Sequence, residues 1–260
     1  MSVAYDPAAS AAILAGAWRS GRLLADLPAN AKPNTLDQGY DVQDLLLAVS
    51  NGHRAGWKLG VGSPAAMRAG QLARPLVGQL VTSRIHPHGA HISLPSEDAV
   101  TVECEVAFVL AQDITPVRGR QLAVEDVRHM CVTFELVRSR FIDRRAVGWP
   151  AFAADNVGFE ALVLSRPVCA GLDRELLAAV NDSASISLNG REKARALSGD
   201  AATDPIGAMN ALLAHAAERS ITLRAGEIVS TGAMCQPFDL AGRGHEVVAT
   251  FLNHSLAFTL

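Results

Sequence analysis

The sequence predicts an α+β protein with a β-rich core of antiparallel strand pairs and a helical amino-terminal segment. Apolar residues recur at three- and four-residue spacing through the first fifth of the chain, a pattern typical of amphipathic helices. After Asn51-Gly52 the chain consists mainly of short apolar runs separated by Gly and Pro, a pattern typical of strands. The 260 residues are 49% hydrophobic and 19% charged, which indicates one well-buried globular protein.

Two helices are expected in the amino-terminal segment. The first runs from Ala8 to about Leu27, and Gly21 weakens it locally. A polar connection containing two prolines, residues 28–33, follows it. The second helix begins at Thr35, a good N-cap with Gln38 three residues later, and continues to about Ser50.

The rest of the chain alternates apolar runs with turn residues. Helices are expected at residues 124–129 and 204–219, and Asp204-Pro205 is a favourable start for the second. We therefore divide the chain into a helical segment, residues 1–75, and a β-rich core, residues 76–260. The apolar runs predict strands at residues 57–61, 76–81, 90–94, 100–110, 132–137, 161–164, 186–189, 228–230, 246–252 and 255–258.

Composition excludes several classes of partner and location. A net charge of -3 provides no overall attraction to nucleic acid or to an anionic membrane surface, so neither partner is expected. The four cysteines are dispersed and form no C-x-x-C pair, which favours a reducing compartment over a disulfide framework. Without a signal peptide pattern or a run of about 18 apolar residues, the protein is expected to be cytoplasmic.

Three carboxylates interrupt otherwise apolar strands. Glu103 and Glu105 belong to the run 102–110, and Glu135 belongs to the run 131–137. Because side chains alternate along a strand, Glu103 and Glu105 point to the same face, about 7 Å apart. Two anions in one partly buried space repel each other and resist ionisation, so a bound divalent cation would compensate them.

A second interpretation needs no metal. Glu103 and Glu105 would lie on a solvated face, since ionised residues are mostly exposed. Glu135 would then pair with a nearby arginine, for which the candidates are Arg138, Arg140, Arg144 and Arg145. Spacing alone does not separate these two interpretations.

Four sequence blocks stand out in order along the chain: Gly56-Trp-Lys-Leu-Gly60 with Ser63, residues 102–110, residues 134–140 with Ala154-Asp-Asn156, and residues 225–232. Together they resemble the 2-keto-4-pentenoate hydratase and 4-oxalocrotonate decarboxylase branch of the fumarylacetoacetate hydrolase superfamily. The resemblance implies a β-roll like the carboxyl-terminal domain of that superfamily, with residues 76–260 as its metal-binding catalytic core.

The resemblance also implies roles for individual residues. Glu103, Glu105 and Glu135 match metal ligands, and three carboxylates suit a hard cation such as Mg²⁺ or Mn²⁺. Lys58 and Asn156 match catalytic positions. Substrate-binding positions are matched by Ser63, Thr231 and Gly232.

The implied activity is a metal-dependent hydro-lyase that adds water to a 2-hydroxy-2,4-dienoate through a metal-stabilised enolate. The alternatives are a decarboxylase of a 4-oxalocrotonate-like 2-keto diacid, an acylpyruvate C–C hydrolase and a catalytically silent scaffold subunit. The expected partners are a small 2-keto or 2-hydroxydienoic acid and further copies of the chain as a homo-oligomer, with a related pathway enzyme as another possible partner. Phe159 stands where relatives often carry a hydroxyl residue.

Two other groups of residues are expected to be structural. His86, His88 and His91 surround Pro87 and Gly89, which favours a surface hairpin over a metal cluster. The segment 138–140, Arg-Ser-Arg, is expected to form structural ion pairs rather than a substrate clamp.

Overall fold

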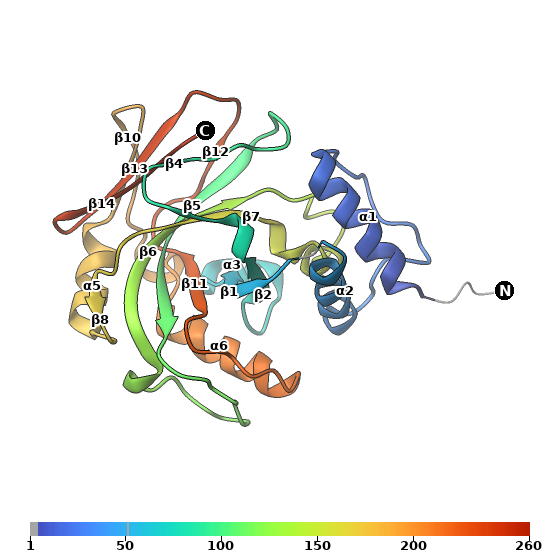
Figure 1. Cartoon of the computed structure of the whole chain (residues 1–260), viewed down its shortest axis with the longest axis horizontal. Coiled ribbons are helices and arrows are strands. Elements are labelled where there is room, and N and C mark those ends of the chain that lie inside the picture. The colour runs from blue at the N-terminus through green and yellow to red at the C-terminus, as the bar shows by residue number, and fades with distance from the viewer. Residues whose placement is uncertain (1–4, 51) are drawn as a thin grey trace.

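A computed structural model describes residues 5–50 and 52–260. Two β-sheets lie together at the centre, α6 lies below them, and α1 and α2 stand at the amino-terminal side (Figure 1). The helices are α1 (Pro7–Ser20), α2 (Leu36–Val49), α3 (Pro64–Gly70), α4 (Trp149–Ala154), α5 (Arg174–Ser183) and α6 (Pro205–Glu218). The predicted α+β class is thus confirmed.

The larger sheet has nine strands and follows the path β2-β1-β11-β5-β6-β7-β3, with β12 paired to β5 and β8 paired to β6. The long antiparallel pair of β5 and β6 forms its centre, and β1 runs parallel to β11. Its strands are β1 (Arg54–Gly60), β2 (Leu76–Val81), β3 (Ile85–Pro87), β5 (Val100–Leu110), β6 (Val127–Val137), β7 (Phe159–Leu164), β8 (Cys169–Ala170), β11 (Ile228–Ala233) and β12 (Phe238–Leu240).

The smaller sheet has five strands in the order β10-β9-β13-β14-β4. Antiparallel pairing joins its first four strands, and β4 joins β14 in parallel. The strands are β4 (Ala90–His91), β9 (Ser185–Leu188), β10 (Arg191–Arg195), β13 (Glu246–Phe251) and β14 (His254–Thr259).

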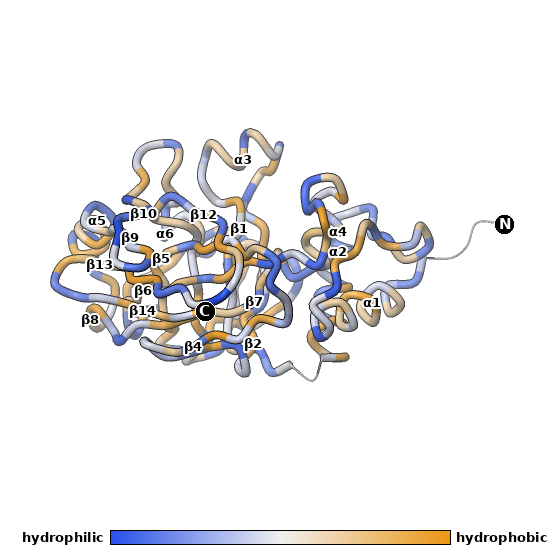
Figure 2. Tube along the Cα trace, turned by 90° about the horizontal axis from the view of Figure 1, so that it is seen from above, coloured by the Kyte–Doolittle hydropathy of each residue, from blue (hydrophilic) through white to orange (hydrophobic). Residues whose placement is uncertain are grey.

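Strand β5 separates two hydrophobic cores. Its even-numbered side chains, such as Val102 and Phe108, join the main core with the smaller sheet and α6. Its odd-numbered side chains face the other way, where Ala107 joins a second core under α1 and α2. The helices α2 and α4 lie beside α1 at this side of the molecule (Figure 2). Glu103 and Glu105 are therefore on the face opposite the main core, as the period of two predicts.

Most predicted strands are confirmed to within a few residues, but two predicted helices need correction. The first helix ends at Ser20 rather than Leu27, because Gly21 takes a left-handed φ of 74° and stops it. The predicted helix at residues 124–129 is wrong: only Val124–Asp126 forms a short 3₁₀ turn. From Val127 onward the chain pairs with β5, so strand pairing overrides the local helical preference.

The histidine-rich segment is not a hairpin. Strand β3, which contains His86, pairs with β7 in the larger sheet, whereas β4, which contains His91, pairs with β14 in the smaller sheet. The turn between them therefore carries the chain from one sheet to the other. In the described part of the chain, the group of acidic, His or Cys residues that could hold a metal contains no histidine.

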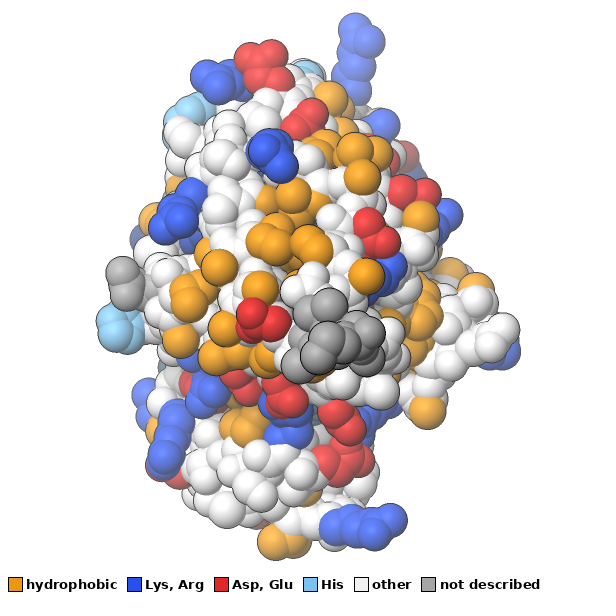
Figure 3. Space-filling model, turned by 90° about the vertical axis from the view of Figure 1, so that its right-hand side faces the viewer, with side chains coloured by type: hydrophobic (Ala, Val, Ile, Leu, Met, Phe, Trp, Pro, Cys, Tyr) orange, Lys and Arg blue, Asp and Glu red, His pale blue; other side chains and the backbone are white. Residues whose placement is uncertain are grey.

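The face of the molecule on the α1 side carries apolar side chains in its middle, with charged side chains around them (Figure 3). Exposed apolar area of this kind is common on single chains and does not by itself identify an interface. Homo-oligomer formation and a cytoplasmic location therefore stay predictions. Among the described residues, none of the helices has the length and apolar character needed to span a bilayer.

The division at residue 75 also stays a prediction. Helices α1 and α2 pack against each other, which fits a helical segment. Strand β1, from the same part of the sequence, is an internal strand of the nine-stranded sheet between β2 and β11. Lys58 thereby enters the β-rich core directly from the amino-terminal segment.

Candidate metal and substrate site

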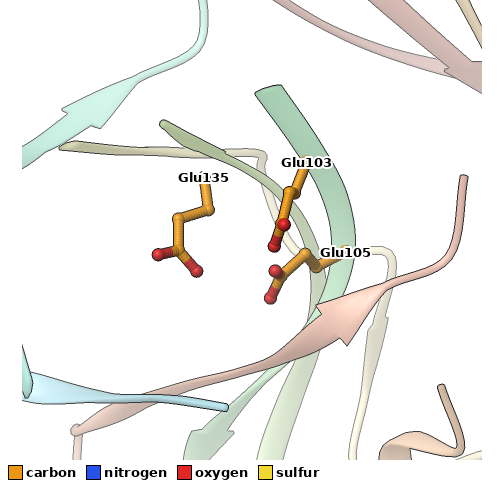
Figure 4. Close-up of side chains that lie close together, drawn as sticks. All are labelled: Glu103, Glu105 and Glu135. Atoms are coloured by element: carbon orange, nitrogen blue, oxygen red, sulfur yellow. The ribbon is translucent and has the colours of Figure 1, made fainter. Parts of the chain in front are cut away.

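Three glutamates converge at the centre of the nine-stranded sheet. Glu103 on β5 lies directly opposite Glu135 on β6, and Glu105 is two residues further along β5. Their carboxylates point into one common space (Figure 4). One oxygen from each carboxylate lies within 4.8 Å of the others, close enough for all three to contact one cation.

The solvated-face interpretation does not describe this cluster. Glu105 and Glu135 are fully buried, and only Glu103 is partly exposed. Glu135 pairs with Lys58, whose Nζ lies 2.8 Å from Glu135 Oε1, and not with an arginine. As the structural interpretation predicted, the arginines of segment 138–140 make other ion pairs, Arg138 with Glu160 and Arg140 with Asp155.

Hydrogen bonds hold Glu105 in one orientation. Its Oε2 accepts from the Ser230 hydroxyl at 2.6 Å and from the Gly232 amide at 2.8 Å. The Ser230 hydroxyl also lies 2.8 Å from the Thr133 hydroxyl. The other oxygen, Glu105 Oε1, is buried without a hydrogen-bond partner.

Burial and mutual repulsion raise the pKa values of two of these acids. The pKa of Glu105 is raised well above its ordinary value, chiefly by burial and then by the charges of Glu135 and Glu103. Burial raises the pKa of Glu135 to about 7, although Lys58 opposes the shift. Glu135 Oε2 also lacks a hydrogen-bond partner, whereas Oε1 is paired with the Lys58 ammonium group. Unpaired, converging carboxylate oxygens are the donor set that a hard divalent cation prefers, so these residues fit such an ion.

Lys58 lies in a narrow slot made by glycines. On the facing strand, a Cβ at Gly78 would come within 2.7 Å of Lys58 Cδ. Two residues along β1, a Cβ at Gly60 would lie 3.3 Å from Lys58 Nζ. The ammonium group also donates to the Val157 carbonyl at 3.2 Å. Absence of side chains at these two glycines is what lets a fully buried lysine lie beside Glu135.

The Asn156 side chain bonds to backbone and not to the glutamates. Its Oδ1 accepts from the Gln79 amide at 2.7 Å, and its Nδ2 donates to the Gln79 carbonyl at 2.8 Å. Asn156 and Val157 both have a left-handed φ of 51°, and this turn directs the Val157 carbonyl toward Lys58. Asn156 thus fastens the turn to β2 and positions a partner of Lys58.

The three predicted substrate-binding residues occupy different places. Gly232 is adjacent to Glu105 through its amide, with a φ of 103° that favours glycine. The Thr231 hydroxyl is buried and donates to the Val106 carbonyl at 2.8 Å. The Ser63 hydroxyl caps α3 by accepting from the Ala66 amide at 3.2 Å. The structure therefore places only the Gly232 amide directly on the glutamate cluster.

Sequence reasoning missed several residues that build the site. Ser230 lies within the block 225–232, and a hydroxyl two residues before Gly232 would share its side of the strand. Gly60 lies between Gly56 and Gly62, and Gly78 interrupts an apolar strand, which in both cases is a sign that another group approaches the backbone closely. Thr133 and Thr203 carry no such local signal. A Cβ at Gly232 would lie 3.0 Å from Thr203, so this threonine closes one side of the site.

The chain is similar to several known proteins. Residues 54–255 match the family model described as fumarylacetoacetate (FAA) hydrolase C-terminal. The chain is 29% identical over 232 residues to a 2-keto-4-pentenoate hydratase of Burkholderia vietnamiensis, covering 87% of each protein.

Solved structures show the same fold. A 4-oxalocrotonate decarboxylase from Pseudomonas putida G7, complexed with magnesium and adipate, superposes with a TM-score of 0.83 at 18% identity, covering 97% of this chain and 96% of the other. The same decarboxylase complexed with calcium and acetate superposes with a TM-score of 0.81 over the same shares of the chains. At 18% identity the likeness shows the fold alone. Because it covers 97% of this chain, it includes both the predicted β-roll and the helical amino-terminal segment.

Proposed function

The chain belongs to the fumarylacetoacetate hydrolase family, and from this premise we propose that it is a hydro-lyase that adds water to a 2-hydroxy-2,4-dienoate. The observation that carries the proposal is the convergence of Glu103, Glu105 and Glu135, with buried oxygens left unpaired, beside the ammonium group of Lys58. The 29% identity to a 2-keto-4-pentenoate hydratase supports hydration as the reaction.

Glu103, Glu105 and Glu135 would hold Mg²⁺ or Mn²⁺. When bound, such an ion supplies Lewis acidity toward the carbonyl oxygen of a 2-keto acid. The protein's part is to fix the donor atoms in advance. Ser230 and Gly232 hold one oxygen of Glu105 and leave the other free, so the carboxylate needs little reorganisation to bind a cation.

Lys58 is proposed as the residue that moves a proton during ketonisation of the dienol. Its Nζ has three donor positions, of which the Glu135 carboxylate and the Val157 carbonyl occupy two. The third can face the substrate. The Glu135 carboxylate, whose Oε1 lies 2.8 Å from Nζ, holds the ammonium group in place beside the site.

Asn156 is proposed to act through Lys58 rather than on the substrate, because both of its polar side-chain atoms bond to the Gln79 backbone. Thr231 and Gly232 are proposed to lie at the carboxylate end of the substrate, and Ser63 is proposed as a further substrate-binding residue. The Ser63 and Thr231 hydroxyls already have protein partners, so their contribution would be to shape the site as well as to bind.

Phe159 does not replace a missing hydroxyl group. It is fully buried in the second core under α1 and α2, among apolar residues. The attacking water must therefore be held by other groups. Decarboxylation and acylpyruvate cleavage would begin from the same three carboxylates and are alternatives that the experiment distinguishes.

The test is to give the metal-free protein a 2-hydroxy-2,4-dienoate, a 4-oxalocrotonate and an acylpyruvate in turn, with and without Mg²⁺. Ultraviolet absorbance and CO₂ release are followed together. We expect Mg²⁺-dependent loss of the dienol absorbance without CO₂. CO₂ release from the oxalocrotonate alone would establish the decarboxylase instead, and cleavage of the acylpyruvate alone would establish the hydrolase. No reaction with any substrate would support the scaffold alternative.

A further inference from the structure

A small apolar cluster adjoins the site on the side of Lys58. It contains Val157 in its buried part and, partly exposed around it, Val61, Leu72 and Trp149. We name these four residues the tail cluster. They come from the end of β1, the segment after α3, the start of α4 and the turn after it, so only the folded chain brings them together.

The tail cluster is continuous with the catalytic groups through Gly60. A Cβ at Gly60 would lie 2.7 Å from Val157 Cγ1 and 3.3 Å from Lys58 Nζ, so these two groups flank the same point. Lys58 in turn contacts Glu135. The order in space is therefore carboxylates, then Lys58, then the tail cluster.

We propose that the tail cluster binds the distal end of the substrate's carbon chain and selects an uncharged alkyl group over a second carboxylate. The inference rests on the proposed function, because the carboxylates and Lys58 are taken to hold the 2-keto acid end. Lys58 and Val157 flank the same point beside Gly60, so a chain that leaves that end alongside Lys58 would run toward the tail cluster. The tail cluster would then distinguish monoacid from diacid substrates.

Three of the polar groups on or near the tail cluster already have partners. The Trp149 indole Nε1 donates to the Gly70 carbonyl at 2.8 Å, so the ring offers an apolar surface and no free donor. Arg68 and Arg74, which lie on or just after α3, pair with Asp200 and Glu218. Figure 2 shows α3 projecting from the sheets, where these contacts tie it to the neighbouring segments.

Arg144 is a nearby cation that argues against selection for an uncharged group. The guanidinium of Arg144 lies 5.9 Å from the centre of the Phe152 ring, and Phe152 packs against the tail cluster. A distal carboxylate that reached Arg144 would be stabilised there. Without such a contact, moving a carboxylate onto an apolar surface carries a large desolvation penalty, whereas an alkyl group gains from leaving water.

The test uses three unreactive 2-oxo acids with the full-length protein and Mg²⁺: pyruvate, 2-oxohexanoate and 2-oxoadipate. Binding is measured by titration calorimetry, so the readout does not depend on turnover. We expect 2-oxohexanoate to bind at least about tenfold more tightly than either of the others, because its extra methylene groups meet an apolar subsite. Equal or tighter binding of 2-oxoadipate would overturn the inference.

Two variants test whether the tail cluster is the subsite that binds the distal end of the substrate. Leu72→Ala should weaken 2-oxohexanoate binding about tenfold and leave pyruvate binding unchanged. The matched control is Leu176→Ala, a partly buried leucine on α5 that packs against the main core. Equal effects of the two variants would contradict the assignment. Absence of Mg²⁺-dependent pyruvate binding would refute the proposed function itself, whereas pyruvate binding without any preference among the longer acids refutes only the tail cluster.

Discussion

Replacing Glu105 with glutamine gives a direct measure of the metal site. The amide keeps the shape of the side chain, and its oxygen can still accept from Ser230 and Gly232. Its nitrogen then stands where the unpaired Oε1 was and cannot bind a cation. The measurement is thermal unfolding at pH 8, where Glu135, with a pKa of about 7, is mostly ionised.

The expected shift follows from linkage. An ion present at a hundred times its Kd stabilises the folded chain by about 2.7 kcal/mol. For a chain of this size that raises Tm by about 5 to 10 °C. If Glu105→Gln weakens binding about a hundredfold, the same Mg²⁺ concentration contributes about 0.4 kcal/mol, or at most about 2 °C.

The metal-free variant should be more stable than the metal-free wild type. Folding raises the pKa of Glu105, so its carboxylate destabilises the folded state at pH values above its ordinary pKa, and the amide removes this effect. The control is Glu246→Gln, the same change at an exposed position on β13. An Mg²⁺ shift of equal size in Glu105→Gln and in the wild type would refute the metal site.

Three other predictions test separate parts of the structure. Ser230→Ala removes one hydrogen bond that orients Glu105, so Mg²⁺ affinity measured by calorimetry should fall about ten- to a hundredfold; an unchanged Kd would contradict that role. Gly78→Ala places a methyl group 2.7 Å from Lys58 Cδ and 3.1 Å from the Asn156 backbone oxygen, so kcat and Tm should both fall, and a normal kcat would show that the slot is unimportant. Burial lowers the pKa of His215 to about 3, so the stability that depends on its neutral form is complete above pH 6.5 and is lost as the pH falls toward 3. That loss amounts to about 5 kcal/mol. The free energy of unfolding, measured in urea, should fall less at acid pH in His215→Phe than in the wild type. Identical pH profiles of the two proteins would contradict this.

Local sequence patterns were sufficient to predict the central strands and the residues at which helices α2 and α6 begin. The alternation along residues 100–110 correctly placed Glu103 and Glu105 on one face, because the period of two follows from strand geometry alone. Thr35 and Asp204 cap α2 and α6 as predicted, since capping depends on a few neighbouring backbone amides.

The resemblance identified residues but not how they interact. It selected Lys58 and Asn156, yet the two differ in structure: Lys58 contacts Glu135, whereas Asn156 is engaged with the Gln79 backbone. A motif shows that a residue type is present at a position. Which atom its side chain meets depends on segments far away in the sequence.

The sequence by itself determined the fold class, the strand that carries two of the carboxylates and the residue types of the site, because each depends on interactions within a few residues. Only the tertiary structure decided that Glu135 lies opposite Glu103, that Lys58 and not an arginine pairs with it, and that residues 127–131 extend a strand. Strand register and the burial of charges depend on contacts between distant segments. A one-residue slip between β5 and β6 would turn Glu135 to the other face, so the pairing register that assembles the site is a property of the folded chain.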